Sequence, residues 1–302
     1  MNFGYNSEFG YIGRNRRKDT STPVPMVVDP VAAGAYHSLA LKSDGSIVSW
    51  GKNNDNQVLN TPSGTDFVQV AAGEDHSLVL KTDGSIVSWG SNSQNQVLNT
   101  PAETGFVQIA GGHSHSLALK SDGSIVAWGW DNFNQVLDTP TTSDFVQVAA
   151  GMSHSLAIKS DGSLVAWGDN GYNQVSTTPA GTDFAQIAAG NYYSLALKSD
   201  GSIVSWGHDN KTQVSGTPVG TGFAKVTAGT VHSLAIKSDG SMESWGDDGY
   251  TQVTDTPVGT GFAQIAAGIG HSLALKTDGS LVSWGFDYYD QVLNTPTTSD
   301  FG

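Results

Sequence analysis

The chain has 302 residues, no cysteine and a formal net charge of −14. The absence of cysteine excludes disulfides and thiolate-held metal sites, and an acidic surface disfavours binding to the phosphates of nucleic acids. No apolar run of about 18 residues and no apolar leader occur, so the sequence predicts no membrane-spanning helix and no signal peptide. We expect a soluble protein of unknown compartment, whose acidity suits either solubility or a basic partner.

A 39-residue unit repeats from residue 28 to the end of the chain. Its seven copies start near residues 28, 67, 106, 145, 184, 223 and 262. Residues 1–27 precede the copies and resemble a surplus second half of one unit, because Phe3-Gly4-Tyr5-Asn6 is similar to their Trp-Gly-x-Asn. A period of about 20–50 residues indicates a repeat architecture in which neighbouring copies bury one continuous core.

The second unit shows the predicted elements in chain order. A strand of small residues ends at 70–73, and an alternating strand follows at 76–81. Asp83-Gly84 predicts a hairpin turn of type I′ into a third strand over 85–90. A fourth strand is predicted over 96–101. Because four short strands in about 40 residues are typical of a propeller blade, the sequence predicts an all-β, seven-bladed β-propeller with four antiparallel strands per repeat.

The spaced pattern Gly-x-x-His-Ser-Leu-Ala-Leu-Lys, Asp-Gly, Trp-Gly-x-Asn, Gln resembles the regulator-of-chromosome-condensation repeat family over residues 28–300. Within that family the chain is most similar to bacterial-type propellers, including the secreted β-lactamase inhibitory propellers. The resemblance implies a propeller with a protein-binding role. Asn95-Gln96-Val97 departs from the family's usual Gly-Gln-Leu-Gly, and this departure disfavours the guanine-nucleotide exchange that some relatives perform on small GTPases.

Seven complete units close a ring without residues 1–27. Val28 and Phe301 lie 273 residues apart, which is seven times 39. The surplus half-unit has four interpretations: it replaces strands where the ring closes, lies outside the ring, pairs with a neighbouring molecule, or is a tail outside the fold. A monomer is the default expectation, and self-association through this segment is the alternative.

Positions that repeat in every unit are predicted to build the core. Tyr193 occupies in one unit the position that holds a histidine in the six others, at His37, His76, His115, His154, His232 and His271. Because each lies one blade from the next, we expect hydrogen-bonded core histidines rather than metal ligands. No nucleophile–base pair, metal cluster or phosphate loop stands out, so we predict no catalytic residue, no metal site and no cofactor.

A second repeated feature is a leucine in four neighbouring units. The four residues are Leu59, Leu98, Leu137 and Leu293. They lie in the predicted fourth strand, so we favour a well-packed strand edge over a contact patch on the rim of the ring.

Variable residues gather in two loops of each unit: one after the opening glycine, and one between Trp-Gly and the glutamine. In an up-and-down blade the first and third turns lie at the same end, so both loops are predicted on one face of the ring. That face collects the aromatic residues Tyr36, Trp130, Phe133, Tyr172, Tyr192, Tyr250, Phe286, Tyr288 and Tyr289, and the carboxylates Glu74, Asp75, Asp131, Asp209 and Asp248. Aromatic residues among carboxylates on loops of a rigid scaffold are typical of a binding surface.

We therefore predict a non-enzymatic, protein-binding propeller whose partner is a protein. The negative charge is compatible with a basic partner, although solubility alone is the favoured explanation of that charge. Guanine-nucleotide exchange on a small GTPase is one alternative. Glycan binding is another, because aromatic platforms with Asp and Asn also suit sugars, and a self-assembling structural module is a third.

Overall fold

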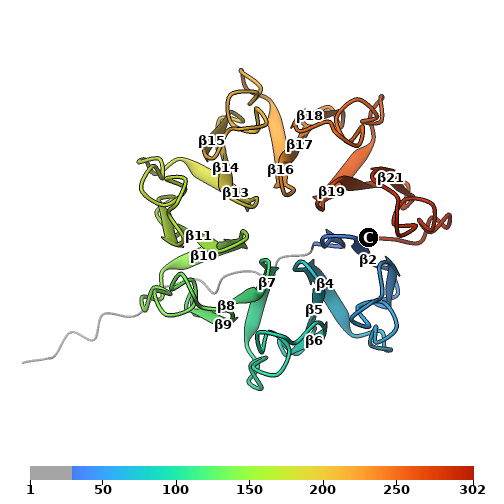
Figure 1. The fold of residues 1–302 in the computed structure, drawn as a ribbon, viewed down its shortest axis with the longest axis horizontal. Helices are drawn as coiled ribbons and strands as arrows, with labels where there is room; N and C mark the ends of the chain where they lie inside the picture. Colours follow the sequence, from blue (N-terminus) through green and yellow to red (C-terminus); the bar gives the residue numbers. More distant parts are fainter. Residues whose placement is uncertain (1–28) are drawn as a thin grey trace, which may run out of the picture.

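The computed structural model describes residues 29–302, which form seven antiparallel sheets placed as blades around a central axis (Figure 1). The predicted seven-bladed, all-β propeller is confirmed. The predictions made for residues 1–27 concern a segment that lies outside the described residues. No helix in the described part of the chain is long and apolar enough to cross a membrane.

Each blade has three strands in chain order from the axis to the rim. The innermost strands are β1 (Val31–Ala33), β4 (Phe67–Ala72), β7 (Phe106–Gly111), β10 (Phe145–Ala150), β13 (Phe184–Ala189), β16 (Phe223–Ala228) and β19 (Phe262–Ala267). The middle strands are β2 (His37–Leu41), β5 (His76–Lys81), β8 (His115–Lys120), β11 (His154–Lys159), β14 (Tyr193–Lys198), β17 (His232–Lys237) and β20 (His271–Lys276). The outer strands are β3 (Ile47–Gly51), β6 (Ile86–Gly90), β9 (Ile125–Gly129), β12 (Leu164–Gly168), β15 (Ile203–Gly207), β18 (Met242–Gly246) and β21 (Leu281–Gly285).

The predicted fourth strand is replaced by a run of turns. In the second blade, Asn95 has a φ of 61°, a left-handed conformation that a strand does not accept. The side chain of Asn92 then accepts hydrogen bonds from the backbone N–H groups of Val97 (3.0 Å) and Leu98 (2.8 Å). These N–H groups are occupied locally, so the segment cannot pair with the outer strand.

The four leucines of this segment are exposed, not packed as we had favoured. Leu59, Leu98 and Leu137 are each 73% exposed and Leu293 is 75% exposed. Because the segment turns away from the sheet, it offers no strand edge on which they could pack.

The Asp-Gly hairpins also differ from the type I′ turn expected. In the first blade Gly45 has a φ of 82°, whereas the aspartate before it stays outside the left-handed region. Gly45 N–H donates to Lys42 C=O (2.9 Å), and Lys42 N–H donates to Ser46 C=O (2.8 Å). This pattern is a three-residue loop with a type I turn followed by a glycine bulge. Asp44 accepts from the backbone and hydroxyl of Ser46, which fixes the loop.

The apolar core lies between blades, and buried polar groups cross it. Leu78 and Leu80 of one blade, for example, pack with Phe106 and Trp128 of the next. The indole N–H of each Trp-Gly tryptophan donates to a glutamine C=O of the preceding blade, as from Trp128 to Gln96 at 2.9 Å. This bond satisfies the only polar atom of a large buried ring.

The six repeated histidines are fully buried, and each Nε2 lies within hydrogen-bonding distance of a serine in the next blade, as in His37 to Ser77 at 2.9 Å. The prediction of core histidines between blades is confirmed. Tyr193 uses its hydroxyl in the same way, with Ser233 Oγ at 3.0 Å.

The C-terminus completes the first blade. Phe301 pairs antiparallel with Lys42, the register that Phe67 holds with Lys81 in the second blade. The indole N–H of Trp50 donates to Gln291 C=O (2.9 Å) across the same seam. The last residues therefore join the last blade to the first.

Candidate functional site

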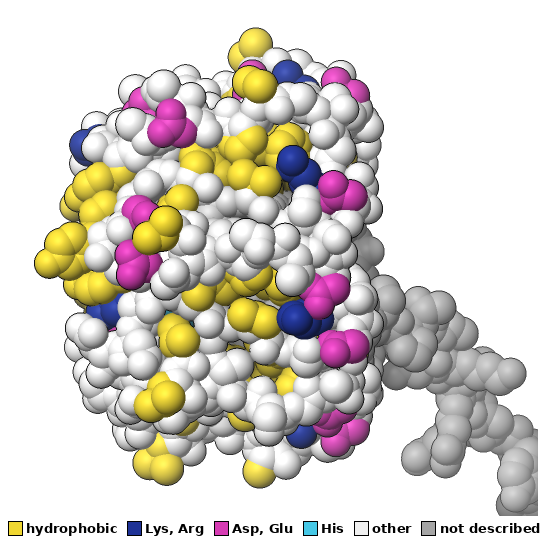
Figure 2. Space-filling model, turned by 90° about the vertical axis from the view of Figure 1, so that its right-hand side faces the viewer, with side chains coloured by type: hydrophobic (Ala, Val, Ile, Leu, Met, Phe, Trp, Pro, Cys, Tyr) yellow, Lys and Arg dark blue, Asp and Glu magenta, His cyan; other side chains and the backbone are white. Residues whose placement is uncertain are grey.

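The two variable loops of each blade meet on one face of the ring, as predicted from the strand order. Figure 2 views the disc edge-on: hydrophobic side chains bulge from one face, and lysine and carboxylate side chains alternate along the other. On that second face each middle-strand lysine lies over a phenylalanine ring, as Lys81 does over Phe67 at 5.6 Å. Lys81 also pairs with Asp66 at 3.2 Å. Six of the seven lysines on this face pair with a carboxylate, and the seven aspartates of the Asp-Gly turns leave the face with a net negative charge.

The largest aromatic group on the variable face joins blades 6, 7 and 1. Its centre is Phe286, which follows the last residue of β21, with ring centroids 5.6 Å from Tyr36 and 4.6 Å from Tyr250. Tyr289 lies 5.3 Å from Tyr36 and 4.9 Å from Tyr288. These separations are typical of favourable aromatic pairs. We call these five residues the main aromatic cluster.

Two smaller groups continue around the face. Trp130 meets Phe133 edge-on at 5.5 Å and His113 at 6.3 Å. Tyr172 lies 4.9 Å from Tyr192, across the seam between blades 4 and 5. The loop after Trp-Gly supplies Trp130 and Phe133 to the first group and Tyr172 to the second, and the loop after the opening glycine supplies His113 and Tyr192.

These aromatic residues differ in how far they reach into solvent. Tyr288 is 76% exposed, Tyr250 50%, Phe133 46% and Tyr172 44%. Tyr36, Trp130, Tyr192, Phe286 and Tyr289 are half-buried and support them. An exposed ring held by half-buried rings is oriented before a partner arrives, which lowers the entropic cost of binding.

Three of the predicted site carboxylates have a second role in the turns. Asp131, Asp209 and Asp248 each accept two backbone N–H bonds from the residues five and six positions ahead. The hydroxyl and backbone N–H of Thr254 lower the pKa of Asp248, which therefore stays ionised at neutral pH. Asparagine does the same work in three other blades, at Asn53, Asn92 and Asn170. The turn therefore needs only a side-chain oxygen that accepts these backbone hydrogen bonds. Aspartate in place of asparagine at this position adds negative charge to the face.

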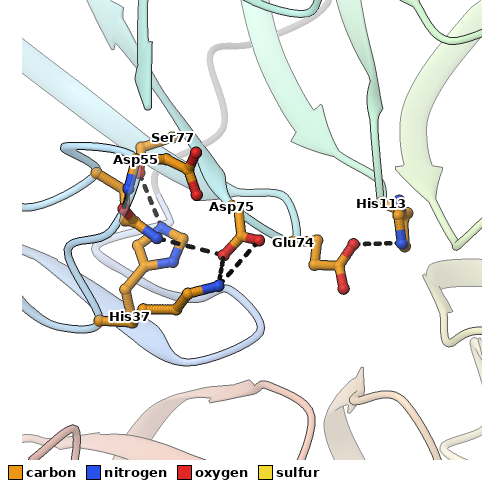
Figure 3. A network of polar contacts seen from close by, with 8 residues as sticks. His37, Asp55, Glu74, Asp75, Ser77 and His113 are labelled. Atoms are coloured by element: carbon orange, nitrogen blue, oxygen red, sulfur yellow. Dashed lines mark hydrogen bonds and ion pairs between the residues drawn. The ribbon is translucent and has the colours of Figure 1, made fainter. Parts of the chain in front are cut away.

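Glu74 and Asp75 are tied into polar contacts that link the first three blades (Figure 3). Lys52 Nζ contacts both oxygens of Asp75, at 2.9 and 3.1 Å, and Gln57 donates to the same carboxylate at 3.2 Å. Glu74 forms an ion pair with His113. The structure thus gives both predicted site carboxylates an internal partner.

Sequence reasoning missed three residues of this face: Lys52, His113 and His208. Lys52 lies 5.6 Å from the centroid of Tyr36, and His208 lies 4.0 Å from that of Tyr172. Lys52 and His208 directly follow Trp-Gly, as Trp130 and Phe286 do. Their shared position directly after Trp-Gly is therefore the sequence feature that could have identified Lys52 and His208 as residues of this face.

No group of three or more His, Asp or Glu side chains in residues 29–302 is arranged to hold a metal ion. The features of the variable face are therefore aromatic rings, carboxylates and loop backbone, which suit recognition.

A family model described as RCC1-like domain matches residues 3–300. The chain belongs to the RCC1-like domain family. No curated protein sequence matches it.

Three solved structures share the fold at low sequence identity. The ACR4 receptor kinase ectodomain of Arabidopsis thaliana is 21% identical, with 86% of this chain and 98% of that one covered and a TM-score of 0.70. The CR4 receptor kinase ectodomain of Physcomitrella patens is 21% identical, with 85% and 73% covered and a TM-score of 0.73. Prp20p of Saccharomyces cerevisiae is 23% identical, with 92% and 86% covered and a TM-score of 0.66. At these identities the likeness concerns the fold alone.

Proposed function

We propose that this RCC1-like propeller is a non-enzymatic protein-binding module and that its variable face is the binding surface. The observation that carries the proposal is the main aromatic cluster, which presents Tyr288 at 76% exposure above half-buried rings. Tyrosine and tryptophan supply large contact area at a small entropic cost, and they dominate the energy of many interfaces. Loop drift without a function would favour Ser, Gly, Asn and Asp instead.

The charge on this face favours a basic partner. Lys52 is paired with Asp75, and Lys211 is paired with Asp247 at 2.7 Å. Asp248, Asp287 and Asp290 are exposed near the main aromatic cluster, and no ion pair in residues 29–302 engages them. Uncompensated carboxylates accelerate the approach of a positively charged surface.

Fold relatives that bind proteins support this assignment by analogy. Yeast RCC1 (Prp20) is solved bound to Kap60, and Prp20p is described with its binding to Gsp1p and histones. Such analogy concerns the scaffold, whereas the aromatic face is a feature of this chain.

The test compares two quadruple variants with the unmodified chain in pull-downs from the native source. The face variant carries Phe133→Ser, Tyr172→Ser, Tyr250→Ser and Tyr288→Ser. The matched rim control carries Leu59→Ser, Leu98→Ser, Leu137→Ser and Leu293→Ser, which removes as many exposed apolar groups. We expect a protein captured by the unmodified chain and the rim control but lost from the face variant. Equal capture by the face variant would disprove the assignment. A nucleotide-release assay on any captured small GTPase tests the alternative function, guanine-nucleotide exchange.

A further inference from the structure

The ring encloses a central cavity of about 350 Å³, lined by the innermost strands of all seven blades. This volume lies at the lower end of the range for small-molecule sites, about 300–1,000 Å³. One polar position of the innermost strand faces the cavity. Five blades place glutamine there: Gln69, Gln108, Gln147, Gln186 and Gln264. Blade 6 has Lys225 instead, and blade 1 has Pro30 preceded by Asp29.

The glutamines have a structural role that lysine cannot fill. Gln69 Oε1 accepts from Ile109 N–H (2.9 Å), and its Nε2 donates to Ile109 C=O (3.2 Å) in the next blade. Gln186 makes the same pair of bonds with Val226, at 3.0 and 3.2 Å. The amide thus pairs with the free edge of the neighbouring strand as a backbone amide would. An ammonium has no acceptor, so Lys225 forfeits the bond to the N–H of the next blade.

Lys225 and Asp29 put opposite charges on the wall of one cavity. No ion pair within residues 29–302 joins them. Burial lowers the pKa of Lys225, and the charge of Asp29 opposes that shift. Burial likewise raises the pKa of Asp29, against the hydrogen bond from Gln69 (2.9 Å) and the charge of Lys225. Both groups are thus partly desolvated, and neither forms an ion pair within residues 29–302.

We propose that the central cavity binds a small zwitterion of the amino-acid class, with its carboxylate at Lys225 and its ammonium at Asp29. Such a ligand carries two opposite charges a few bonds apart. Lys225 and Asp29 offer it two opposite charges on the wall of one cavity, and each of them influences the pKa of the other. This site is independent of the aromatic face and takes a different class of ligand.

The probes are glycine, β-alanine and γ-aminobutyrate, which separate the two charges by increasing lengths. Acetate and ethylamine are the single-charge controls. Binding to the full chain is measured by calorimetry and by the rise of Tm with ligand concentration. Lys225→Gln restores the residue of five other blades, so it is expected to fold with unchanged or raised Tm, and Asp29→Asn removes charge at constant shape.

We expect at least one zwitterion to bind the unmodified chain, and each variant to weaken that binding by about tenfold or more. Acetate and ethylamine should bind at least about tenfold more weakly than the best zwitterion. The proposal is overturned if none of the three zwitterions binds the unmodified chain, if Lys225→Gln binds equally well, or if acetate alone binds as tightly. The measurements on the unmodified chain decide the matter even if one variant fails to fold.

Discussion

His271 Nε2 lies 3.0 Å from Ser38 Oγ, although 233 residues separate them in the chain. The contact is the last of seven equivalent links between middle strands, six made by histidine and one by Tyr193. All of these side chains are fully buried. The first and last blades are therefore joined by the same polar link as every other pair.

Tyrosine should replace histidine in this ring of links at little cost. Both residue types pack against the glycine that directly follows the innermost strand, as Tyr193 does against Gly190 and His154 against Gly151. We predict that His154→Tyr changes the free energy of unfolding by less than about 1.5 kcal/mol. Tyr193→Phe should cost about 1–3 kcal/mol, because it removes the buried hydroxyl that bonds His232 C=O and Ser233 Oγ. Urea unfolding measures both, and an equal loss in the two variants would contradict the role given to the hydroxyl.

The buried histidines predict a steep loss of stability in mild acid. Burial lowers the pKa of His154 and His232 to about 4 and that of His37 and His271 to about 3, from an ordinary value of 6.5. Below pH 6.5 the unfolded chain binds protons that the folded chain refuses, so the free energy of unfolding falls as the pH drops toward 4. With six such histidines the slope approaches about 8 kcal/mol per pH unit.

Unfolding free energies measured between pH 7.5 and 4.5 check this expectation. Stability should be flat above pH 7 and fall steeply below 6. His154→Tyr removes one of the six protons, so its slope should be shallower by about 1.4 kcal/mol per pH unit. A transition that begins only near pH 4, where carboxylates titrate, would rule out the histidines as its cause.

Phe301 is predicted to hold the ring closed. Its side chain is buried with Leu275 and Trp50 in the core between the last and first blades. Its backbone follows Asp300, whose carboxylate pairs with Lys42 at 3.0 Å. Phe301→Ala should lower the free energy of unfolding by about 3–5 kcal/mol and speed hydrogen exchange in β2 and β21. Phe301→Leu serves as the conservative control, and a loss below about 1 kcal/mol for the alanine variant would mean that the ring closes without this residue.

Thr212 offers a stabilising substitution. Its φ of 58° places a β-branched residue in the left-handed region, where four other blades have asparagine and one has aspartate. Asparagine adopts this conformation at a lower energetic cost than β-branched threonine, so Thr212→Asn should raise the free energy of unfolding by about 1 kcal/mol. The change in Tm measures it. The control is Asn173→Thr, which should lower stability by a similar amount, and an unchanged Tm in both variants would contradict the strain.

The repeat period determined what could be predicted from sequence. The fixed 39-residue step gave seven blades, the buried histidines and the shared face of both variable loops, because each follows from strand alternation or strand order. The fourth strand was wrong since Asn95 takes a left-handed conformation that composition alone does not reveal. The hairpin type was wrong because Asp-Gly also suits a three-residue loop.

Side-chain partners on the face depended on contacts between blades. Glu74 meets His113 and Asp75 meets Lys52 only after the ring brings neighbouring loops together. A single unit contains no signal for such pairs. The position after Trp-Gly, which supplies Lys52, Trp130 and Phe286, was the available clue to which loop residues reach the seams.

Site-specific crosslinking tests the binding face most directly. A photoreactive phenylalanine analogue replaces Tyr288 on the main aromatic cluster, Leu59 on the rim, or Ser43 on the Asp-Gly face, and the protein is irradiated in extract from its native source. Because Tyr288 is the most exposed ring of the cluster, we predict a discrete crosslinked protein at position 288 and none at the other two. A crosslinked partner at position 43 or 59, with none at 288, would contradict the binding face proposed for this propeller.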